Sequence, residues 1–330
     1  QAFAGCAVAW STGEVSNVNI HKSTVTNSSN GTGAVANIVR KITNCHADSC
    51  NITGMQGFVG GLVGQLNESM SACSATNMRI VGASAKNNPS PTGGLAGMTN
   101  FQSEMTDSYF SGTIDTASNY TVCYTGGLAG SSQGGTMERC FFVGTVRGYS
   151  ADSYTGGLIG YAMSVNIIDC YANGRVDNPT GRRTGGLTGF LTNGTYENET
   201  VPGTIKNSYS SAAMLAETYM YNPETERREL FGIINTDAKY TFENCYFNKQ
   251  LVNFGSTQYG VLTSDLVAAS GPEGFSPDTW IFQQGQYPRL KGIDQNQAAL
   301  YSSSALIMHD NSSLNKLSQD ASFNALGETD

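Results

Sequence analysis

A glycine-leucine core that returns five times constrains this chain more than any other feature of its sequence. The clearest copy is Thr92-Gly93-Gly94-Leu95-Ala96-Gly97. Successive cores begin at residues 60, 93, 126, 156 and 185, so their spacings are 33, 33, 30 and 29 residues. Self-similarity at such a period indicates a repeat architecture. Looser copies near residues 5, 33 and 230 extend the series to about eight units.

A second landmark follows most cores after 11 to 14 residues, as in Arg139-Cys140-Phe141-Phe142. It is a cysteine or a serine, often followed by an aromatic residue. The other copies are Cys45, Cys73, Ser108, Cys170, Ser208 and Cys245. The residue before the landmark is Asn44, Asp107, Asp169, Asn207 or Asn244 in five copies. Asn and Asp tolerate left-handed backbone, so this position predicts a turn.

Each unit of about 30 residues reads as three short strands with their turns, because Gly, Val, Thr, Tyr and Phe favour strands and turns over helices. One unit cannot bury its own apolar face, but stacked units can. The sequence therefore predicts an all-β parallel β-solenoid of about eight coils. A β-propeller is the alternative, but its blades need roughly 40–45 residues, and these units are shorter.

Stacking places equivalent residues in columns. We expect an inward leucine column, flanked by glycines at corners that need positive φ or a close approach of neighbouring backbone. The structural repeat positions are Gly61, Leu62, Gly94, Leu95, Gly127, Leu128, Gly157, Leu158, Gly186 and Leu187, with Cys140, Cys170 and Cys245 at the landmark.

Together the core and the landmark resemble the GLUG motif, which is named for Gly, Leu, a small residue and Gly. That motif occurs in secreted and surface proteins of bacteria, including adhesin-like proteins and some IgA-specific metallopeptidases. The resemblance covers about residues 1–292, and Trp280 with Tyr287-Pro288-Arg289-Leu290 looks like the usual terminus of such a module. It implies a right-handed parallel β-helix and cell-surface adhesion. The motif is structural, so the resemblance implies no catalytic residue.

Charge and hydropathy exclude several partners. The net charge is −8 and no run of basic residues exists, which argues against nucleic acid. No apolar stretch approaches the ~20 residues that span a bilayer, and we recognise no N-terminal leader.

The chain opens inside a repeat at Gln1-Ala2-Phe3, so we expect it to be a piece of something longer. Asn-x-Ser/Thr sequons such as Asn119 suit an extracellular, cell-surface protein.

The eight cysteines allow three interpretations. A buried column of thiols is favoured, because Cys45, Cys140, Cys170 and Cys245 share one repeat position and Cys73 lies close to it. Disulfides such as Cys140–Cys170 are the second, since neighbouring coils bring Cα atoms within ~4.8 Å. Zinc bound through Cys45, His46 and Cys50 is the third, and no second ligand pair at finger spacing supports it.

Three regions follow from the pattern. Residues 1–252 form the β-helix, 253–292 a C-terminal cap, and 293–330 a tail or the start of a following β domain. In the cap, Thr263 or Ser264 is a possible N-cap of a short helix that ends near Gly271. We expect the cap to cover the end of the last coil, whose strand edge would otherwise invite aggregation. Residues 191–228 read as an insertion that bulges from one face.

Catalytic chemistry is weakly supported. The histidines His21, His46 and His309 are far apart and read as surface residues, and the glycine-rich cores lack the Lys-Ser/Thr of a phosphate loop. A glycoside hydrolase needs two carboxylates facing one groove. The carboxylates considered are Glu104, Asp107, Glu138, Asp152 and Asp169. Calcium could use Asp107 and Asp169, but no calcium-binding loop is present.

We therefore predict a protein that is not an enzyme and has no cofactor and no metal site. It would be an extracellular adhesion or stalk module that binds a glycan or a surface protein through a solenoid face or the 191–228 insertion. Tyr219 and Tyr221 are the first contacts to consider, because aromatic rings suit sugars. The alternatives are a polysaccharide lyase or hydrolase on a β-helix, and a subunit of a surface filament that self-associates through coil ends or the tail.

Overall fold

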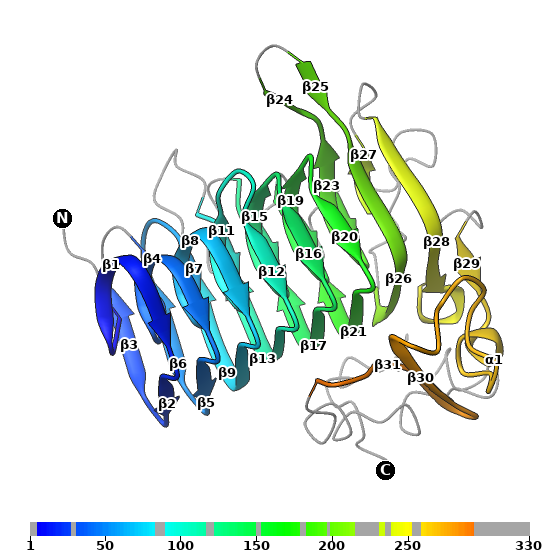
Figure 1. Cartoon of the computed structure of the whole chain (residues 1–330), viewed down its shortest axis with the longest axis horizontal. Coiled ribbons are helices and arrows are strands. Elements are labelled where there is room, and N and C mark those ends of the chain that lie inside the picture. The colour runs from blue at the N-terminus through cyan, green and yellow to red at the C-terminus, as the bar shows by residue number, and fades with distance from the viewer. Residues whose placement is uncertain are drawn as a thin grey trace.

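The computed structural model describes residues 5–27, 31–82, 90–116, 122–149, 153–178, 183–196, 199–214, 231–234, 239–252 and 259–293. Over these residues the chain is a β-solenoid whose coils stack in parallel register (Figure 1). This confirms the predicted all-β fold. The tail after residue 293, together with Tyr219 and Tyr221, lies outside the described residues.

Two long ladders carry most of the solenoid. The motif face stacks β1 (Val8–Ser16), β4 (Ala36–Thr43), β8 (Val63–Ser71), β11 (Ala96–Thr99), β15 (Ala129–Gln133), β19 (Ile159–Met163), β23 (Thr188–Thr192) and β27 (Phe231–Ile234). The landmark face stacks β2 (Asn19–His21), β5 (His46–Asp48), β9 (Ser74–Gly82), β13 (Tyr109–Thr116), β17 (Phe141–Arg147), β21 (Tyr171–Asp177), β26 (Gly203–Ala213) and β28 (Tyr240–Asn248).

Shorter strands complete the coils. β3 (Thr24–Asn27) and β6 (Asn51–Gly54) continue the landmark face in the first two coils, and β12 (Glu104–Thr106), β16 (Thr136–Glu138) and β20 (Asn166–Ile168) form a middle face. A separate sheet of five precedes the motif corner: β7 (Val59–Gly60), β10 (Thr92–Gly93), β14 (Tyr124–Gly126), β18 (Tyr154–Gly156) and β22 (Arg183–Gly185). Only five of the described coils therefore have every face, and the predicted count of about eight holds for the two long ladders alone.

The motif leucines are the centre of the core. Leu62, Leu95, Leu128, Leu158 and Leu187 are all completely buried. Their backbone continues the ladder round the corner, because the amides of the first four donate to the Leu carbonyl of the next coil at 2.8–3.0 Å. Of the two reasons expected for glycine at these corners, positive φ is found at none of the motif glycines. Close approach is what requires glycine: a Cβ on Gly127 would lie 2.0 Å from the carbonyl oxygen of Gly157.

The landmark Cys or Ser closes a turn. The residue before it has φ near +50° in every described copy, from Asn44 (49°) to Asn244 (50°). The Cys170 thiol donates to the Ile168 carbonyl at 3.1 Å and accepts the Cys140 amide at 3.4 Å. The Ser208 hydroxyl does the same one coil later, donating at 2.8 Å and accepting the Cys170 amide at 3.0 Å. Either Cys or Ser can occupy this position, because both side chains are small and can donate and accept a hydrogen bond.

All eight cysteines are free thiols, and all but Cys6 are buried. Burial raises the pKa of the Cys245 thiol to about 12 and that of Cys170 well above its usual value. Such thiols are protonated at neutral pH and are poor nucleophiles. Cys170 and Cys245 are therefore structural in character, whereas the hydrogen bond with Cys73 lowers the pKa of Cys45 to about 7.

The landmark hydrogen bonds predict that two substitutions of Cys170 destabilise the fold to different extents. Cys170→Ser is expected to change the free energy of unfolding by less than about 1 kcal/mol, because serine already fills this position at Ser208. Cys170→Ala is expected to cost about 2 kcal/mol, because the buried Cys140 amide loses its acceptor. Denaturant unfolding of both variants measures the difference. Equal losses would mean that the thiol serves only to fill space.

Two predicted segments differ from the structure. Among the described residues of the proposed 191–228 insertion, the antiparallel hairpin of β24 (Gly194–Tyr196) and β25 (Glu199–Val201) projects, as Figure 1 shows, whereas β26 is a regular ladder strand. The helix α1 (Thr263–Leu266) has Leu262 as its N-cap residue, not Thr263 or Ser264, and ends before Gly271. The Asp265 side chain accepts the Leu262 amide at 3.1 Å, which supplies the cap from the first turn instead.

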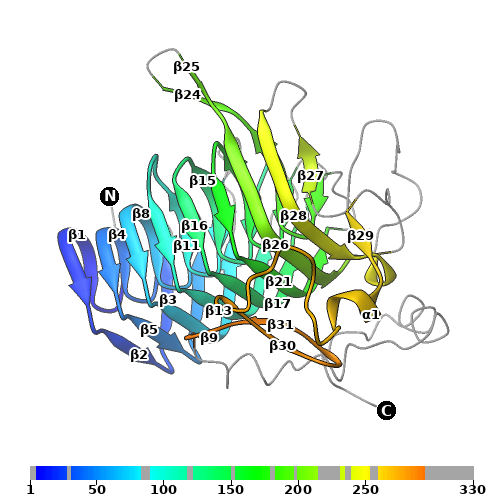
Figure 2. The same cartoon turned by 45° about the vertical axis from the view of Figure 1, so that its right-hand side comes forward.

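The C-terminal segment is more than an end cap. After η1 (Lys249–Leu251), β29 (Gly260–Val261) pairs with β28 at the end of the solenoid. The chain then turns back, and the hairpin of β30 (Trp280–Gln283) and β31 (Gln286–Leu290) lies along the side of the landmark face (Figures 1 and 2). Residues 259–293 are called the strap below. No helix among the described residues is long and apolar enough to cross a bilayer.

Candidate functional site

One outward-facing column of the landmark face changes character along the solenoid. Its members, in register, are Asn19, His46, Ser74, Tyr109, Phe141, Tyr171, Tyr209 and Tyr246. From Tyr109 to Tyr209 the rings stack nearly parallel, with centroids 4.7, 4.8 and 5.2 Å apart. These rings face each other, so they form a continuous apolar ladder. Before Tyr109 the column is polar.

The strap covers the aromatic part of this column. Trp280 is 1% exposed and lies 5.9 Å from the Tyr209 ring and 6.1 Å from the Tyr171 ring, measured between centroids. Its indole Nε1 donates to Asp169 at 3.0 Å, and the Tyr209 hydroxyl donates to the Pro288 carbonyl at 2.7 Å. Trp280 thus packs on the side of the landmark face, whereas Tyr287 also accepts a hydrogen bond from Asn248 of the last ladder strand at 2.6 Å. The strap closes this side, where the rings of the ladder would otherwise be exposed.

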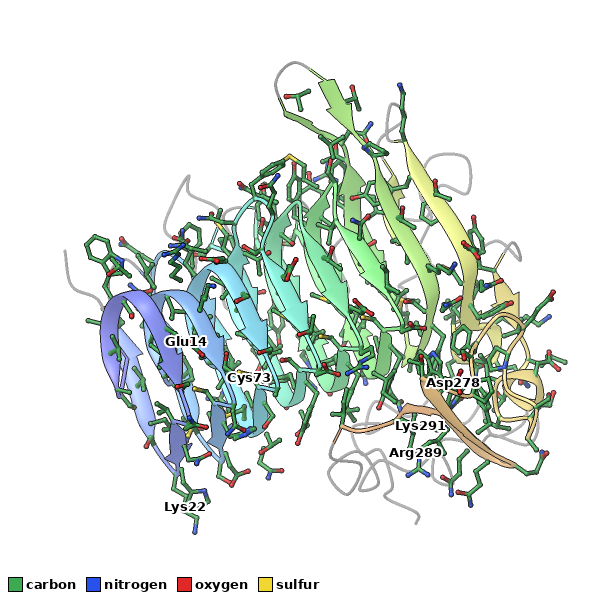
Figure 3. The ribbon with its side chains drawn as sticks, viewed as in Figure 1. Glu14, Lys22, Cys73, Asp278, Arg289 and Lys291 are labelled. Carbon is green, nitrogen blue, oxygen red and sulfur yellow. The ribbon has the colours of Figure 1, made fainter. Side chains whose placement is uncertain are left out.

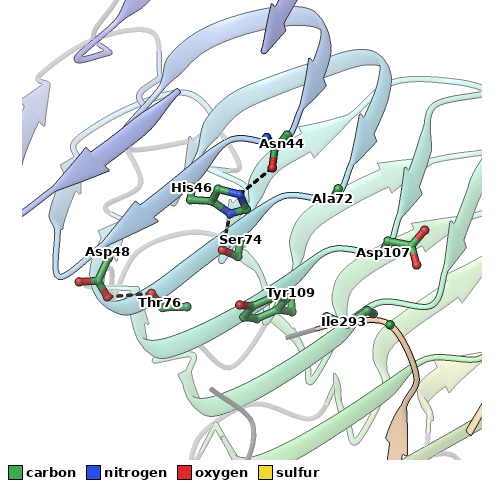
Figure 4. Close-up of a pocket in the computed structure, with 10 residues that line it drawn as sticks. Asn44, His46, Asp48, Ala72, Ser74, Thr76, Asp107, Tyr109 and Ile293 are labelled. Carbon is green, nitrogen blue, oxygen red and sulfur yellow. Dashed lines mark hydrogen bonds between the residues drawn. The ribbon is translucent and has the colours of Figure 1, made fainter. Parts of the chain in front are cut away.

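A groove opens where the strap reaches Ile293. It has a volume of about 460 Å³, and Figure 4 shows the residues that line it. Its lining comes from three consecutive coils and the end of the strap: Asn44, His46, Asp48, Ala72, Ser74, Thr76, Asp107, Tyr109, Gly292 and Ile293. The groove is thus the uncovered, polar continuation of the column that the strap buries.

His46 is held in one orientation by its neighbours. Asn44 donates its Nδ2 to Asn17 at 2.7 Å, which turns its Oδ1 toward His46 Nε2 at 3.0 Å. Nε2 therefore carries the proton, and the Nδ1 lone pair faces the Ser74 hydroxyl at 2.8 Å. Burial lowers the pKa of His46, so the ring is neutral at physiological pH. His46 lies on the outer face, as expected of a surface residue, but it is half-buried and lines the groove.

Asp48 supplies the charge at the other side of the groove. Burial alone would raise its pKa, but hydrogen bonds from Thr76 at 2.7 Å, Asn77 at 2.8 Å and Ser49 at 2.9 Å outweigh burial and lower the pKa. His21 also lies 3.0 Å away. Asp48 is therefore a fixed carboxylate at neutral pH, and its orientation does not depend on a ligand.

The Ser74–His46–Asn44 chain has the order of a nucleophile, a base and an orienting group, but the groove does not support acyl transfer. Ser74 is only 5% exposed. Stabilising an oxyanion needs backbone amides aimed at the reacting carbonyl. The amides of His46, Ser74 and Tyr109 instead donate to carbonyls of the preceding coil at 2.8–3.1 Å. The arrangement is suited to holding a ligand rather than to attacking one.

The carboxylates considered for hydrolysis do not converge. Asp107 accepts a hydrogen bond from Arg139 Nε at 2.7 Å, and Asp169 accepts a hydrogen bond from the Trp280 indole under the strap. Glu104 and Glu138 lie on the middle face, away from the groove. Asp152 lies outside the described residues. Each described member of the set is thus engaged or remote.

The proposed zinc ligands also point apart. Cys45 and Cys50 are 0% and 1% exposed and lie in the core, whereas His46 faces the groove. Within the described ranges, no group of three or more His, Cys, Asp and Glu residues could hold a metal ion. That statement includes the calcium candidates Asp107 and Asp169.

A second surface group was not predicted from the sequence. Tyr161 and Phe190 follow the last glycine of two motifs and stack at 5.5 Å on the motif face, joined by Tyr124 and Tyr154. Arg183 lies 4.8 Å over the Tyr154 ring. The rings are half-buried and mostly face each other, so the group stabilises its own coils. The position after the motif's last glycine is the sequence feature that could have revealed it.

Comparison with known proteins gives a family motif and a distant structural likeness. The GLUG motif matches residues 151–177, the coil from β18 to β21, which confirms the resemblance there. A solved structure described as a "putative immunoglobulin A1 protease from Bacteroides ovatus" is 17% identical, with 80% of this chain and 87% of that chain covered and a TM-score of 0.46. No curated protein matches the chain.

Proposed function

We propose that this chain is a non-catalytic, extracellular adhesion module, and that the groove around His46 binds a carbohydrate. The observation that carries the proposal is the convergence of polar side chains from three coils on one cavity of about 460 Å³. That volume is within the range of about 300–1,000 Å³ typical of small-ligand sites. The rigid coils hold these groups in place before a ligand arrives.

The chemistry of the lining favours a sugar. Sugar hydroxyls both donate and accept hydrogen bonds. Beyond their bonds within the protein, Asn44 Nδ2 keeps a second proton to donate and the Thr76 hydroxyl oxygen can still accept. Asp48 adds a fixed negative charge beside them. With a net charge of −8 on the chain, a neutral or amino sugar is favoured over a polyanion.

A glycan array probed with the labelled chain tests the proposal. We expect binding to neutral or amino-sugar glycans that falls at least about tenfold in His46→Ala, because the ring holds Asn44 and Ser74 in their orientations at the groove. His46→Asn should fold normally, since Asn19 occupies the same column position one coil earlier. The dissociation constants of the variants come from calorimetry with the best glycan.

The matched control is Asn19→Ala, which alters the same column outside the groove and should bind like the unmodified chain. Adhesion to cells before and after enzymatic deglycosylation separates a glycan from a protein partner. A blank array together with adhesion that survives deglycosylation would overturn the carbohydrate assignment. Binding unchanged in His46→Ala would remove the groove from the proposal.

A further inference from the structure

The corner between the motif face and the middle face has connections of unequal length on four consecutive coils. Residues 100–103 and 193–202 form the two long connections, and residues 134–135 and 164–165 form the two short ones between them. The connection at 193–202 carries the β24–β25 hairpin, which projects from this corner in Figure 1. Two short turns between two long ones leave a saddle. Insertions on one face of a solenoid often build a binding surface.

A pocket of about 430 Å³ occupies this saddle, and we call it the saddle pocket. Phe101 from the first long connection and Val201 from the last one line it on opposite sides. The Phe101 ring lies against the floor, since a Cβ on Gly134 would be 2.9 Å from Cδ2 of that ring. Ser164 fastens the other wall, because its hydroxyl donates to the Val201 carbonyl at 2.6 Å and accepts the Gly194 amide at 2.5 Å. Both walls are therefore in place before a ligand arrives.

A row of polar side chains crosses the saddle pocket along the solenoid axis. Glu104, Thr136 and Asn166 stand in register on β12, β16 and β20, and all three line the pocket. Asn166 Oδ1 accepts the Thr204 amide at 3.1 Å, so its Nδ2 remains to donate to a ligand. The row thus offers a carboxylate, a hydroxyl and an amide donor, one on each coil.

Glu104 is the charged member of the lining, and its side chain is exposed. Within the described part of the chain it forms no ion pair. Arg139, which follows the middle-face strand β16, contacts Asp107 instead. Figure 3 shows Arg289 and Lys291 on the strap, away from the hairpin. A carboxylate without a counter-charge, close to an aromatic wall, suits an ammonium or a guanidinium group.

We propose that the saddle pocket binds an extended peptide of a partner protein and that Glu104 pairs with a lysine or arginine of that peptide. Four coils at ~4.8 Å spacing span about 14 Å, which matches about four residues of extended chain. Thr136 and Asn166 would bond the peptide backbone, and Val201 would contact an apolar side chain. A neutral sugar would leave the carboxylate without a counter-charge. This site is separate from the groove around His46 and does not depend on the function proposed for it.

An array of pentapeptides tests the proposal, with arginine, lysine or citrulline at the centre and varied residues around it. Citrulline has the shape of arginine without its charge. We expect the full chain to bind arginine and lysine peptides in preference to citrulline ones, and Glu104→Gln to weaken the best peptide at least about tenfold. Thr136→Arg should abolish binding, because the new guanidinium would lie one ladder step from Glu104. The fold accepts that change elsewhere, since Arg175 is in register with Thr145.

Glu138→Gln is the matched control, because it removes the same charge from the middle face one coil later and outside the pocket. It should bind the peptide like the unmodified chain, as should His46→Ala, which separates this site from the carbohydrate groove. Equal binding of arginine and citrulline peptides, or an array without any bound peptide, would overturn the proposal. So would a loss in Glu138→Gln as large as in Glu104→Gln, because the effect would then come from overall charge.

Discussion

Gly127→Ala is expected to destabilise the solenoid by more than about 4 kcal/mol, although it adds only one methyl group. The new Cβ would lie 2.0 Å from the Gly157 carbonyl oxygen and 2.3 Å from Cγ of Phe142. Neither neighbour can move freely, since the carbonyl belongs to the next coil and Phe142 is fully buried. A decrease in Tm on the order of 10 °C should follow, measured by circular dichroism.

Gly13→Ala is the matched control. A Cβ on Gly13 would meet nothing within 4 Å, so the same methyl group is expected to change stability by less than about 0.5 kcal/mol. The pair separates close packing from the general effect of glycine on backbone entropy, which would act at both sites. Similar Tm values for the two variants would contradict the steric explanation.

The repeat itself was predictable because equivalent residues stack on one another. Leu95 and Leu128 occupy the same position of the repeat. Because one unit cannot bury its own apolar face, this equivalence predicts that both leucines are buried and that the strands of neighbouring units pair in parallel. The turn before the landmark was predictable for a similar reason, because Asn and Asp mark left-handed backbone. Periodicity thus determines the fold without knowledge of any distant contact.

The strap was not predictable in this way, because it joins residues with no periodic relation. Trp280 meets Asp169 across 111 positions of sequence. The residues near Trp280 in the sequence do not indicate whether its side chain packs on the end of the last coil or on the side of the preceding coils. The aromatic column at Tyr109, Phe141, Tyr171 and Tyr209 was visible as a landmark feature, yet each ring alone is equally consistent with an exposed or a covered surface.

The groove depends on the strap as well as on the coils. His46 and Ser74 occupy the column position that is aromatic in later coils, and this departure from the repeat is the sequence feature that marks the site. Its depth depends on the strap reaching Ile293 beside Tyr109. A site made by the irregular members of a regular column is found by searching for exceptions to the repeat rather than for a catalytic motif.

Trp280→Ala is expected to cost about 3–5 kcal/mol and to release the strap, because this residue joins the strap's core to the aromatic ladder. Its ring lies 4.7 Å from Phe275 within the strap and near Tyr171 and Tyr209 on the solenoid. Hydrogen exchange should become faster throughout residues 259–293 while the coil containing Leu128 stays protected. Limited proteolysis should then cleave the strap first.

Two further variants show which interaction holds the strap. Trp280→Phe retains an aromatic ring but loses the hydrogen bond to Asp169, so a smaller loss of about 1–2 kcal/mol is expected. Trp10→Ala removes the same side chain from a position that is 63% exposed and should leave strap protection unchanged. If Trp280→Ala left exchange in residues 259–293 as slow as before, the ladder would not be what anchors the strap. The depth of the groove at Ile293 would then need another cause.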